Sequence, residues 1–533
     1  MCLFQRVQRC HVSESGRLAG VSGGRGIRAL ALSSPWACLL AGGALNLSYA
    51  PFSLWWLAWV LLLPLWLASL QPDPRVRLWR GFLFGLGLFG VGLFWLAQTL
   101  VAHLGAGWPL AMLATGLLVL LCAPFVAGFA WLAGYFRQRL WIWLLALPLL
   151  WWCLEALRFY FLTGLPWLSL GLSQIEGPLA GFVPLVGEKG ASALLCFNSV
   201  LLLCAVIAFG RGERGSRFWM PVSLLLFTLI AGGLLKTVSW TTTSGPALSI
   251  ALVQPATPQP EKRQPRFDQR RLKELSMLSE PYLGRTDLIV WPETVVSMER
   301  EALTSALAGF DLAAQIRGTG LLLGVFDTQK NRLYNKVMTL GRAPDYLYAK
   351  RHLVPLGESV HAGFRFLEDW VPGDTRRGVG RDAQLLTLKG QKLGLSICWE
   401  GSFSRDIVPS VRAGAGVLLN LANEAWFWGS VLPAQNLDAF RLRAMETGRP
   451  AVRLANLGPG GFIDARGRVT AELVANRPGV LRADVVPRQG RTPFVLVGEN
   501  RLLAGALALL SILGCAARFQ GRAPKASVQA ATL

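Results

Sequence analysis

The sequence predicts an α-helical transmembrane bundle of about eight spans with an α/β domain inserted before the last span. Three observations lead to this architecture. Of the 533 residues, 53% are hydrophobic and only 16% are charged, whereas soluble domains average about a quarter charged residues. Apolar runs long enough to cross a bilayer recur along the chain. Between residues 240 and 499 they give way to short apolar segments that alternate with amphipathic ones.

Each predicted span is an apolar run near the ~20 residues that ~30 Å of hydrocarbon requires. The runs cover residues 34–50, 52–70, 80–100, 109–135, 140–157, 188–209, 218–238 and 500–517. Seven spans therefore form a bundle within residues 34–239, and the eighth follows the α/β region. This composition excludes a disordered chain and a purely soluble protein.

The charge of the connecting loops orients these spans. The net charge is +22, yet between 240 and 499 the 33 basic residues nearly balance the 25 acidic ones. Most of the excess therefore lies in the hydrophobic part, where basic loops alternate with nearly neutral ones. Because basic loops stay in the cytoplasm, we expect cytoplasmic tails at 1–33 and 518–533 and place 240–499 outside. The positive charge then requires no nucleic acid partner.

Region 240–499 is interpreted as one α/β domain. Helices are expected at 267–278 and 433–447, the second with proline at its start and glycine after its end. Buried strands are expected at 248–253, 288–291, 321–326, 393–398, 417–421 and 452–455. An alternation of strands and helices over about 260 residues is typical of an α/β fold.

Three candidate catalytic residues follow predicted strands: Glu293, Lys350 and Cys398. The carboxyl ends of strands are where ligands bind in α/β sheets. A thiol attacks only as its thiolate, so Glu293 can serve as the general base that takes the proton of Cys398. Lys350 can lower the thiol pKa and donate to a tetrahedral oxyanion. Together the three groups suit acyl transfer.

Each of these residues also has a purely structural interpretation. Cys398 can be a small buried hydrophobic residue, Glu293 a helix-start carboxylate and Lys350 a solvated charge. Taken singly, the structural interpretations are favoured. Cys398 is the only cysteine within 240–499, which excludes a disulfide inside that region. The histidines lack metal-ligand spacing and no P-loop is present, so we expect no cofactor and no metal.

The motifs around these residues reverse that balance. W-P-E-T with Glu293, K-x-H-L-V-P-x-G-E with Lys350 and C-x-E with Cys398 resemble, in this order, the nitrilase or carbon–nitrogen hydrolase superfamily. Together with the spans and segments such as 163–167 and 423–427, nearly the whole chain resembles the apolipoprotein N-acyltransferase family. This resemblance implies an αββα sandwich at 240–499, facing the periplasm, with a Glu-Lys-Cys triad.

The resemblance also implies a reaction and its partners. Cys398 would take an acyl chain from a phospholipid as a thioester and pass it to the N-terminal amine of a diacylglyceryl-cysteine apolipoprotein. The enzyme would lie in the bacterial inner membrane, among membrane lipids. Glu358 and Glu400 match further family carboxylates and would support the site, as would Trp399 beside the nucleophile.

Four positions depart from the family pattern. Trp399 stands where a tyrosine is usual, Glu424 where an aspartate is usual, Asn436 where a histidine is usual, and Arg263 near a usual aromatic residue. They leave the acceptor and donor preference open, including another amine acceptor. Two rival interpretations stand beside the family one. The eight spans argue against a membrane-tethered carbon–nitrogen hydrolase or amidase, and the intact triad argues against a lipid-binding or lipoprotein-binding protein without activity.

Two charged pairs lie near predicted span ends, Glu155 with Arg158 and Glu188 with Lys189. Charges at membrane depth draw attention because they are costly. Near the end of a span, pairing and snorkelling are at least as common as catalysis. We therefore assign both pairs a structural role.

Overall fold

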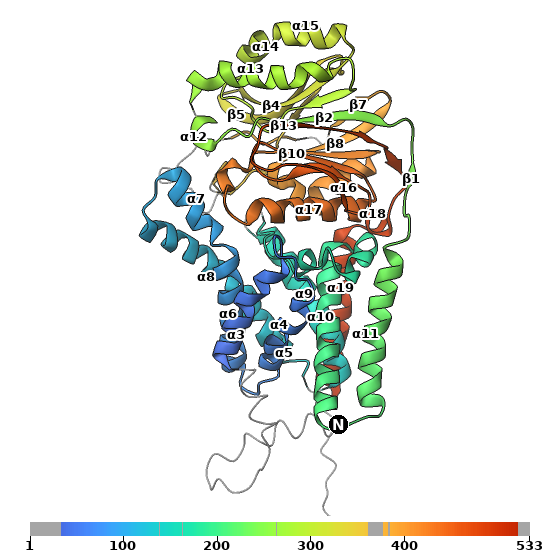
Figure 1. Ribbon diagram of the computed structural model, residues 1–533. Helices are drawn as coiled ribbons and strands as arrows, with labels where there is room; N and C mark the ends of the chain where they lie inside the picture. Colours follow the sequence, from blue (N-terminus) through green and yellow to red (C-terminus); the bar gives the residue numbers. More distant parts are fainter. Residues whose placement is uncertain are drawn as a thin grey trace, which may run out of the picture.

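The chain forms a helical bundle with an α/β domain stacked on one end (Figure 1). The computed structural model describes residues 34–137, 139–161, 164–262, 264–355, 357–360, 377–381 and 384–520. The expected tail at 1–33, most of the expected tail at 518–533, and Arg263 lie outside these ranges.

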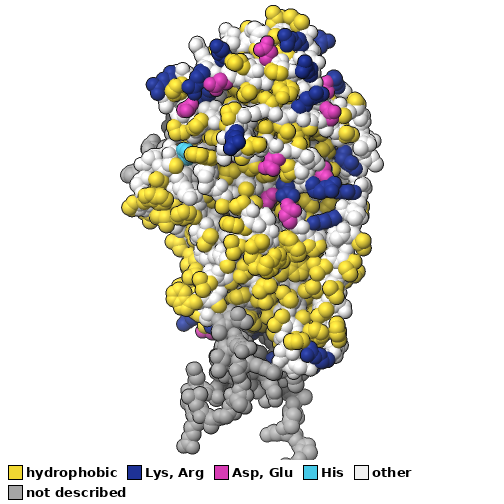
Figure 2. Space-filling model, in the orientation of Figure 1, with side chains coloured by type: hydrophobic (Ala, Val, Ile, Leu, Met, Phe, Trp, Pro, Cys, Tyr) yellow, Lys and Arg dark blue, Asp and Glu magenta, His cyan; other side chains and the backbone are white. Residues whose placement is uncertain are grey.

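Six helices among the described residues are long and apolar enough to cross a membrane. They match the last six expected spans, and the first of them combines two consecutive helices, α6 and α7. The helices are α6 (Pro74–Gly92), α7 (Trp95–Leu104), α8 (Trp108–Ala133), α9 (Leu140–Tyr160), α10 (Val183–Gly210), α11 (Ser216–Leu235) and α19 (Glu499–Gln520). Figure 2 shows that hydrophobic side chains cover the lower half of the molecule. A continuous apolar surface is typical of a membrane-spanning bundle.

The spans expected at 34–50 and 52–70 look different in the structure. They are built from α3 (Pro35–Ala44), the 3-10 turn η1 (Leu45–Ser48), α4 (Leu57–Leu61) and α5 (Leu63–Ser69). Pro51 lies in the break between η1 and α4, and Pro64 lies at the start of α5. Proline cannot donate a backbone hydrogen bond inside a helix. Each piece is shorter than a span requires, so the expected count of eight is not confirmed.

The α/β domain contains two six-stranded sheets in the described part of the chain. The first has the order β13-β2-β3-β4-β5-β6 and the second the order β12-β11-β10-β9-β8-β7. The strands of the first sheet are β2 (Leu248–Gln254), β3 (Leu288–Val290), β4 (Gly320–Gln329), β5 (Arg332–Gly341), β6 (Leu347–Ala349) and β13 (Gly479–Val485). Those of the second are β7 (Leu385–Leu388), β8 (Gln391–Ile397), β9 (Val417–Ala422), β10 (Ala451–Ala455), β11 (Gly460–Ile463) and β12 (Val469–Leu473).

The two sheets face each other across one hydrophobic core. Along β2, Ile250 and Leu252 point into this core, whereas Ala251 and Val253 point to a second core under the outer helices. This alternation is the period-2 pattern of a strand buried on both faces. The outer helices are α13 (Asp268–Ser279), α14 (Arg300–Ala306) and α15 (Ala308–Ile316). Helices α16 (Ser404–Arg412) and α17 (Leu432–Thr447) cover the second sheet and separate it from the bundle (Figure 1). The domain is therefore the expected αββα sandwich.

The central strands bring the candidate residues together at their carboxyl ends. β2, β3 and β4 are parallel, as are β8, β9 and β10. Glu293 follows β3, Cys398 follows β8 and Asn423 follows β9, while Lys350 follows β6 on the antiparallel side of the first sheet. The site consequently lies at the strand ends of both sheets at once.

Candidate active site

Glu293 lies in a tight turn directly after β3. Thr294, the next residue, has φ +42°, a left-handed conformation that is uncommon for a β-branched residue. The turn packs against Gly324 of β4, where an added Cβ would lie 2.7 Å from the Glu293 Cα and 2.4 Å from the Thr294 nitrogen. Only glycine allows this approach, so the sequence of β4 fixes the backbone of Glu293.

The Glu293 carboxylate is buried and held at both oxygens. The Asn335 amide donates to Oε1 at 2.6 Å, and the backbone N–H of Asn423 donates to Oε2 at 2.7 Å. Asn335 comes from β5, whereas Asn423 comes from the end of β9 in the other sheet. The carboxylate is therefore oriented by both sheets.

Lys350 is 1% exposed and lies between two carboxylates. Its Nζ is 2.9 Å from Glu358 Oε2 and 3.6 Å from Glu293 Oε1. Burial alone lowers the pKa of Lys350, but Glu358 and Glu293 more than offset this and raise it above the ordinary lysine value. Lys350 is consequently a permanent cation, suited to bind negative charge rather than to exchange protons.

Cys398 lies where β8 ends and the 3-10 turn η8 (Cys398–Ser402) begins. Its φ is +56°, so this candidate nucleophile occupies a strained strand-to-helix turn, and the Asn420 amide donates to its carbonyl at 3.0 Å. Burial and the Glu293 charge raise the pKa of the thiol, and Lys350 lowers it. The charges of Glu293 and Lys350 both act on Cys398, so the structure brings the three predicted residues together.

Glu400 connects the segments that carry Lys350 and Cys398. It is fully buried, and its Oε1 accepts hydrogen bonds from the backbone N–H groups of Arg351 and His352 at 2.7 and 3.0 Å. Its Oε2 accepts from the Ile397 N–H at 2.7 Å and from the Tyr348 hydroxyl at 2.8 Å. Glu400 thus joins the backbone that follows Lys350 to the backbone that precedes Cys398.

Glu358 contacts the Lys350 ammonium directly. Besides Lys350, it accepts hydrogen bonds from Arg377 at 2.8 Å and from the Val354 N–H at 3.0 Å. Burial alone raises the pKa of Glu358, but Lys350 and Arg377 more than offset this and lower it below the ordinary value. Glu358 therefore stays ionised beside Lys350.

Trp399 packs within an aromatic cluster beside the nucleophile. Its indole N–H donates to the His352 carbonyl at 2.7 Å, and its ring contacts Phe403 and Trp167 at centroid distances of 5.2 and 6.5 Å. The indole therefore has a hydrogen-bond partner although it lacks a phenolic hydroxyl. Trp167 lies in the bundle half of the sequence, so this cluster joins the site to the bundle.

Two of the four departures contact each other. The Asn436 amide lies 3.1 and 3.2 Å from the two carboxylate oxygens of Glu424, which also pairs with Arg453. The Glu424 charge raises the pKa of Cys398, so this cluster is electrostatically coupled to that thiol. The two substitutions form one hydrogen-bonded unit, which the sequence alone did not indicate.

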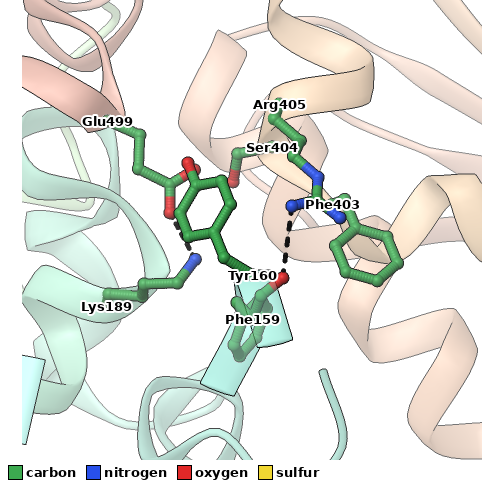
Figure 3. A pocket seen from close by; sticks show the side chains of 7 residues that line it. All are labelled: Phe159, Tyr160, Lys189, Phe403, Ser404, Arg405 and Glu499. Atoms are coloured by element: carbon green, nitrogen blue, oxygen red, sulfur yellow. Dashed lines mark hydrogen bonds and ion pairs between the residues drawn. The ribbon is translucent and has the colours of Figure 1, made fainter. Parts of the chain in front are cut away.

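Of the four charged residues assigned a structural role, Glu188 joins the bundle to the α/β domain, and the other three pair within the bundle helices. Glu188 pairs with Arg443 of α17 at 2.5 Å, and Lys189 pairs with Glu499 at the start of α19. Figure 3 shows Lys189 and Glu499 beside Tyr160 and Arg405 in a small pocket between the two parts. Glu155 accepts from the Leu170 N–H at 2.9 Å and lies 3.9 Å from Arg158.

Sequence reasoning missed Asn335, Asn423 and Lys262. Lys262 donates to the Glu293 carbonyl at 2.8 Å and to the Thr294 hydroxyl at 3.0 Å. Asn423 stood in a segment that resembled the family, but nothing marked its backbone N–H as a carboxylate ligand. Among the described residues, no group of three or more His, Cys, Asp or Glu side chains could hold a metal ion.

Comparisons with known proteins agree with this fold. Residues 249–492 match the carbon-nitrogen hydrolase family, and residues 41–201 match the apolipoprotein N-acyltransferase N-terminal domain. The α/β domain is therefore that of a carbon–nitrogen hydrolase. An apolipoprotein N-acyltransferase of Azotobacter vinelandii is 35% identical over 92% of this chain and 97% of its own. One of Nitrosomonas europaea is 34% identical over 91% of this chain and 98% of its own. The chain belongs to the apolipoprotein N-acyltransferase family.

Among solved structures, a carbon–nitrogen hydrolase superfamily protein of Xanthomonas campestris aligns with a TM-score of 0.34 and 19% identity. The alignment covers 50% of this chain and 96% of that one. An amidase of Nesterenkonia aligns with a TM-score of 0.35 and 16% identity, over 49% of this chain and 97% of that one.

Proposed function

We propose that the protein transfers an acyl chain from a membrane phospholipid to the N-terminal amine of diacylglyceryl-cysteine apolipoproteins. A thioester on Cys398 is the intermediate, and Glu293 and Lys350 complete the triad. The observation that carries this proposal is the placement of a buried Lys350 ammonium 3.6 Å from the Glu293 carboxylate, with both charges acting on the Cys398 thiol. Family membership supports the identity of the acceptor.

In the first half-reaction, Glu293 takes the proton from Cys398 and the thiolate attacks the ester carbonyl of the phospholipid. The new C–S bond gives a tetrahedral intermediate, and Lys350 stabilises its oxyanion. The C–O bond then breaks, and protonated Glu293 returns the proton to the departing alkoxide. The products are a lysophospholipid and the acylated Cys398.

In the second half-reaction, the apolipoprotein amine attacks the thioester carbonyl. Glu293 accepts a proton from the attacking nitrogen, and Lys350 again stabilises the oxyanion. The C–S bond breaks and the amide is released. Glu293 then returns the proton to the Cys398 thiolate, so the enzyme is regenerated with no net change in protons.

The supporting residues act through the triad in this proposal. Glu358 holds the Lys350 ammonium at 2.9 Å, Glu400 fixes the backbone that follows Lys350, and the Trp399 indole fixes the His352 carbonyl. Such outer contacts orient catalytic groups without touching substrate.

We propose a topology with both tails in the cytoplasm and the α/β domain, residues 240–499, in the periplasm. Within 34–239, α3 and the α4–α5 pair supply the first two crossings as broken helices, and residues 500–517 supply the eighth. Support comes from the alternating loop charges. Support also comes from the apolar bundle surface, which ends below the α/β domain in Figure 2. The acyl donor would then be a lipid of the outer leaflet of the inner membrane.

The function is tested by complementation of a conditional bacterial strain that lacks its own N-acyltransferase. Expression of this chain should restore growth, and Cys398→Ala should not. Lys273 is exposed, so Lys273→Met serves as the control and should restore growth as the wild type does. A hydrolase or amidase, using water as the acceptor, would not support growth, and neither would a protein that only binds lipid.

A further inference from the structure

Lys262 is a buried cation outside the triad. It ends the short helix α12 (Gln259–Lys262), in the connection between β2 and α13, and only 7% of it is exposed. Within the described ranges it makes no ion pair; its Nζ donates instead to the Glu293 carbonyl at 2.8 Å and to the Thr294 hydroxyl at 3.0 Å. Burying an ammonium with only neutral acceptors costs free energy, so the presence of Lys262 at this position needs an explanation.

The two acceptors belong to the strained turn of the catalytic base. Thr294 has φ +42°, and sparsely populated conformations of this kind cost about 1–3 kcal/mol unless their surroundings hold them. Gly324 supports the turn from one side. Charge-assisted hydrogen bonds from Lys262 hold its carbonyl and hydroxyl. Gly324 also exchanges backbone hydrogen bonds with Pro292 and Val295 on either side of the turn. Lys262 adds the side-chain contact that holds the Glu293 carbonyl and the Thr294 hydroxyl from another segment.

Lys262 also lies in the electrostatic field of the site. Burial lowers the pKa of Lys262 to about 7. Glu293 and Cys398 raise this pKa, whereas Arg271 and Arg377 lower it further. Glu293 follows β3, Arg271 lies on α13 and Cys398 begins η8, so these groups face Lys262 from three different elements. Near neutral pH both the ammonium and the neutral amine are populated.

We propose that Lys262 is a positioning residue for the catalytic base: its ammonium fixes the Glu293–Thr294 turn and thereby aims the Glu293 carboxylate at Cys398. This inference rests on the proposed function, because it requires Glu293 to act as the base. The neutral amine binds the two acceptors more weakly than the ammonium does. The contribution of Lys262 to the rate should therefore be largest below pH 7 and fade above it.

The test measures acyl-enzyme formation by the full-length protein in detergent with phosphatidylethanolamine as the donor. Intact-protein mass follows the hydroxylamine-labile adduct from about pH 6 to about pH 8.5. Lys262→Met should lower the rate about tenfold at the acidic end and less than threefold at the alkaline end, with KM within twofold of the wild type. Lys262→Gln keeps an uncharged donor, so its rate should lie between those of the wild type and Lys262→Met. Its advantage over Lys262→Met should not fade above pH 7, because glutamine has no proton to lose there.

Two further variants keep the test decisive. Lys273→Met removes an exposed lysine of α13 and should match the wild type at every pH. Thr294→Ala removes one of the two acceptors and should lower the rate two- to threefold even where Lys262→Met fails to fold. A Lys262→Met to wild-type ratio that is the same at both ends of the pH range would overturn the inference, as would equal rates. If the wild type forms no adduct on Cys398 at any pH, the proposed function itself fails.

Discussion

The backbone N–H of Glu188 in α10 donates to the carboxylate of Glu446 in α17 at 2.9 Å. α10 is broken at Gly187, with φ +72°, so Glu188 opens its second segment and its N–H has no partner within the helix. A carboxylate is favourable at such a helix start. Arg443 lies between the two acids, 2.5 Å from Glu188 and 3.1 Å from Glu446, and is fully buried. This ion cluster joins the bundle to the α/β domain.

Removing the cation of this cluster should destabilise the whole protein. Arg443→Met leaves Glu188 and Glu446 buried without a counter-charge, and losing one partner of a buried pair costs ~3–5 kcal/mol. We expect a clear fall in the thermal unfolding temperature in detergent. Arg217→Met, which breaks an exposed pair with Glu213, should change it little. Equal shifts for the two variants would contradict this role.

The covalent step should be visible as a mass increase on Cys398. After incubation with phospholipid, the wild type should gain the mass of one acyl chain, and hydroxylamine should remove it because thioesters are labile to that nucleophile. Cys398→Ala and Glu293→Gln should show no adduct, the first for lack of a nucleophile and the second for lack of a base. An adduct that persists in Cys398→Ala would place the nucleophile elsewhere.

The orientation of the α/β domain can be read from reporter fusions. Loop charges predict that residues after about 240 lie in the periplasm. A periplasmic reporter fused there should be active, and a cytoplasmic reporter should be inactive. Fusions in the basic loop at 211–217 should give the opposite result and serve as the control. Activity of the cytoplasmic reporter after 240 would reject the architecture.

Glu358 should stabilise the folded protein at neutral pH and lose this effect in acid. Its pKa is lowered in the folded protein because Lys350 and Arg377 outweigh burial, so the unfolded chain binds its proton more readily. Stability should therefore rise with pH up to the ordinary glutamate value and be lost as pH falls through the folded pKa. Unfolding temperatures recorded from about pH 3 to about pH 6 should show a shallower acid decline for Glu358→Gln than for the wild type. Exposed Glu472→Gln should keep the wild-type slope.

Glu424 and Asn436 should behave as one unit in the second half-reaction. Glu424→Asp withdraws the carboxylate from the Asn436 amide and from Arg453, and Asn436→His alone crowds the longer Glu424. The double variant restores the pattern usual in the family. Its transfer rate should be about fivefold higher than the product of the two single effects predicts, which is equivalent to ~1 kcal/mol of coupling. The measurement is transfer from acylated Cys398 to a diacylated lipopeptide. Strictly multiplicative single effects would show that the contact has no functional weight.

Glu293, Lys350 and Cys398 could be predicted because the motifs around them resemble, in order, those of the carbon–nitrogen hydrolases. Strand-end position alone left a structural role favoured for each. Six strands, β2, β3, β4, β8, β9 and β10, were predictable because buried strands are short continuous apolar runs. Strands β5 to β7 and β11 to β13 were not predicted. The broken helices before residue 70 were not, because hydropathy measures apolar length and not where a helix is interrupted. Lys262 was also missed: a lysine between Glu261 and Arg263 carries no sequence signal of its own, and its role depends on the backbone of residues distant in sequence.

The first and last strands of the α/β domain lie side by side. β2 pairs along its whole length with β13, and β1 (Thr242–Thr243) pairs with β14 (Arg488–Gln489). The domain therefore begins and ends at the same place, close to where α11 ends and α19 begins. A unit with adjacent termini can be added to a chain without changing the spacing of the helices that flank it. This geometry lets the bundle carry the sandwich as an insertion between α11 and α19 without separating these two helices.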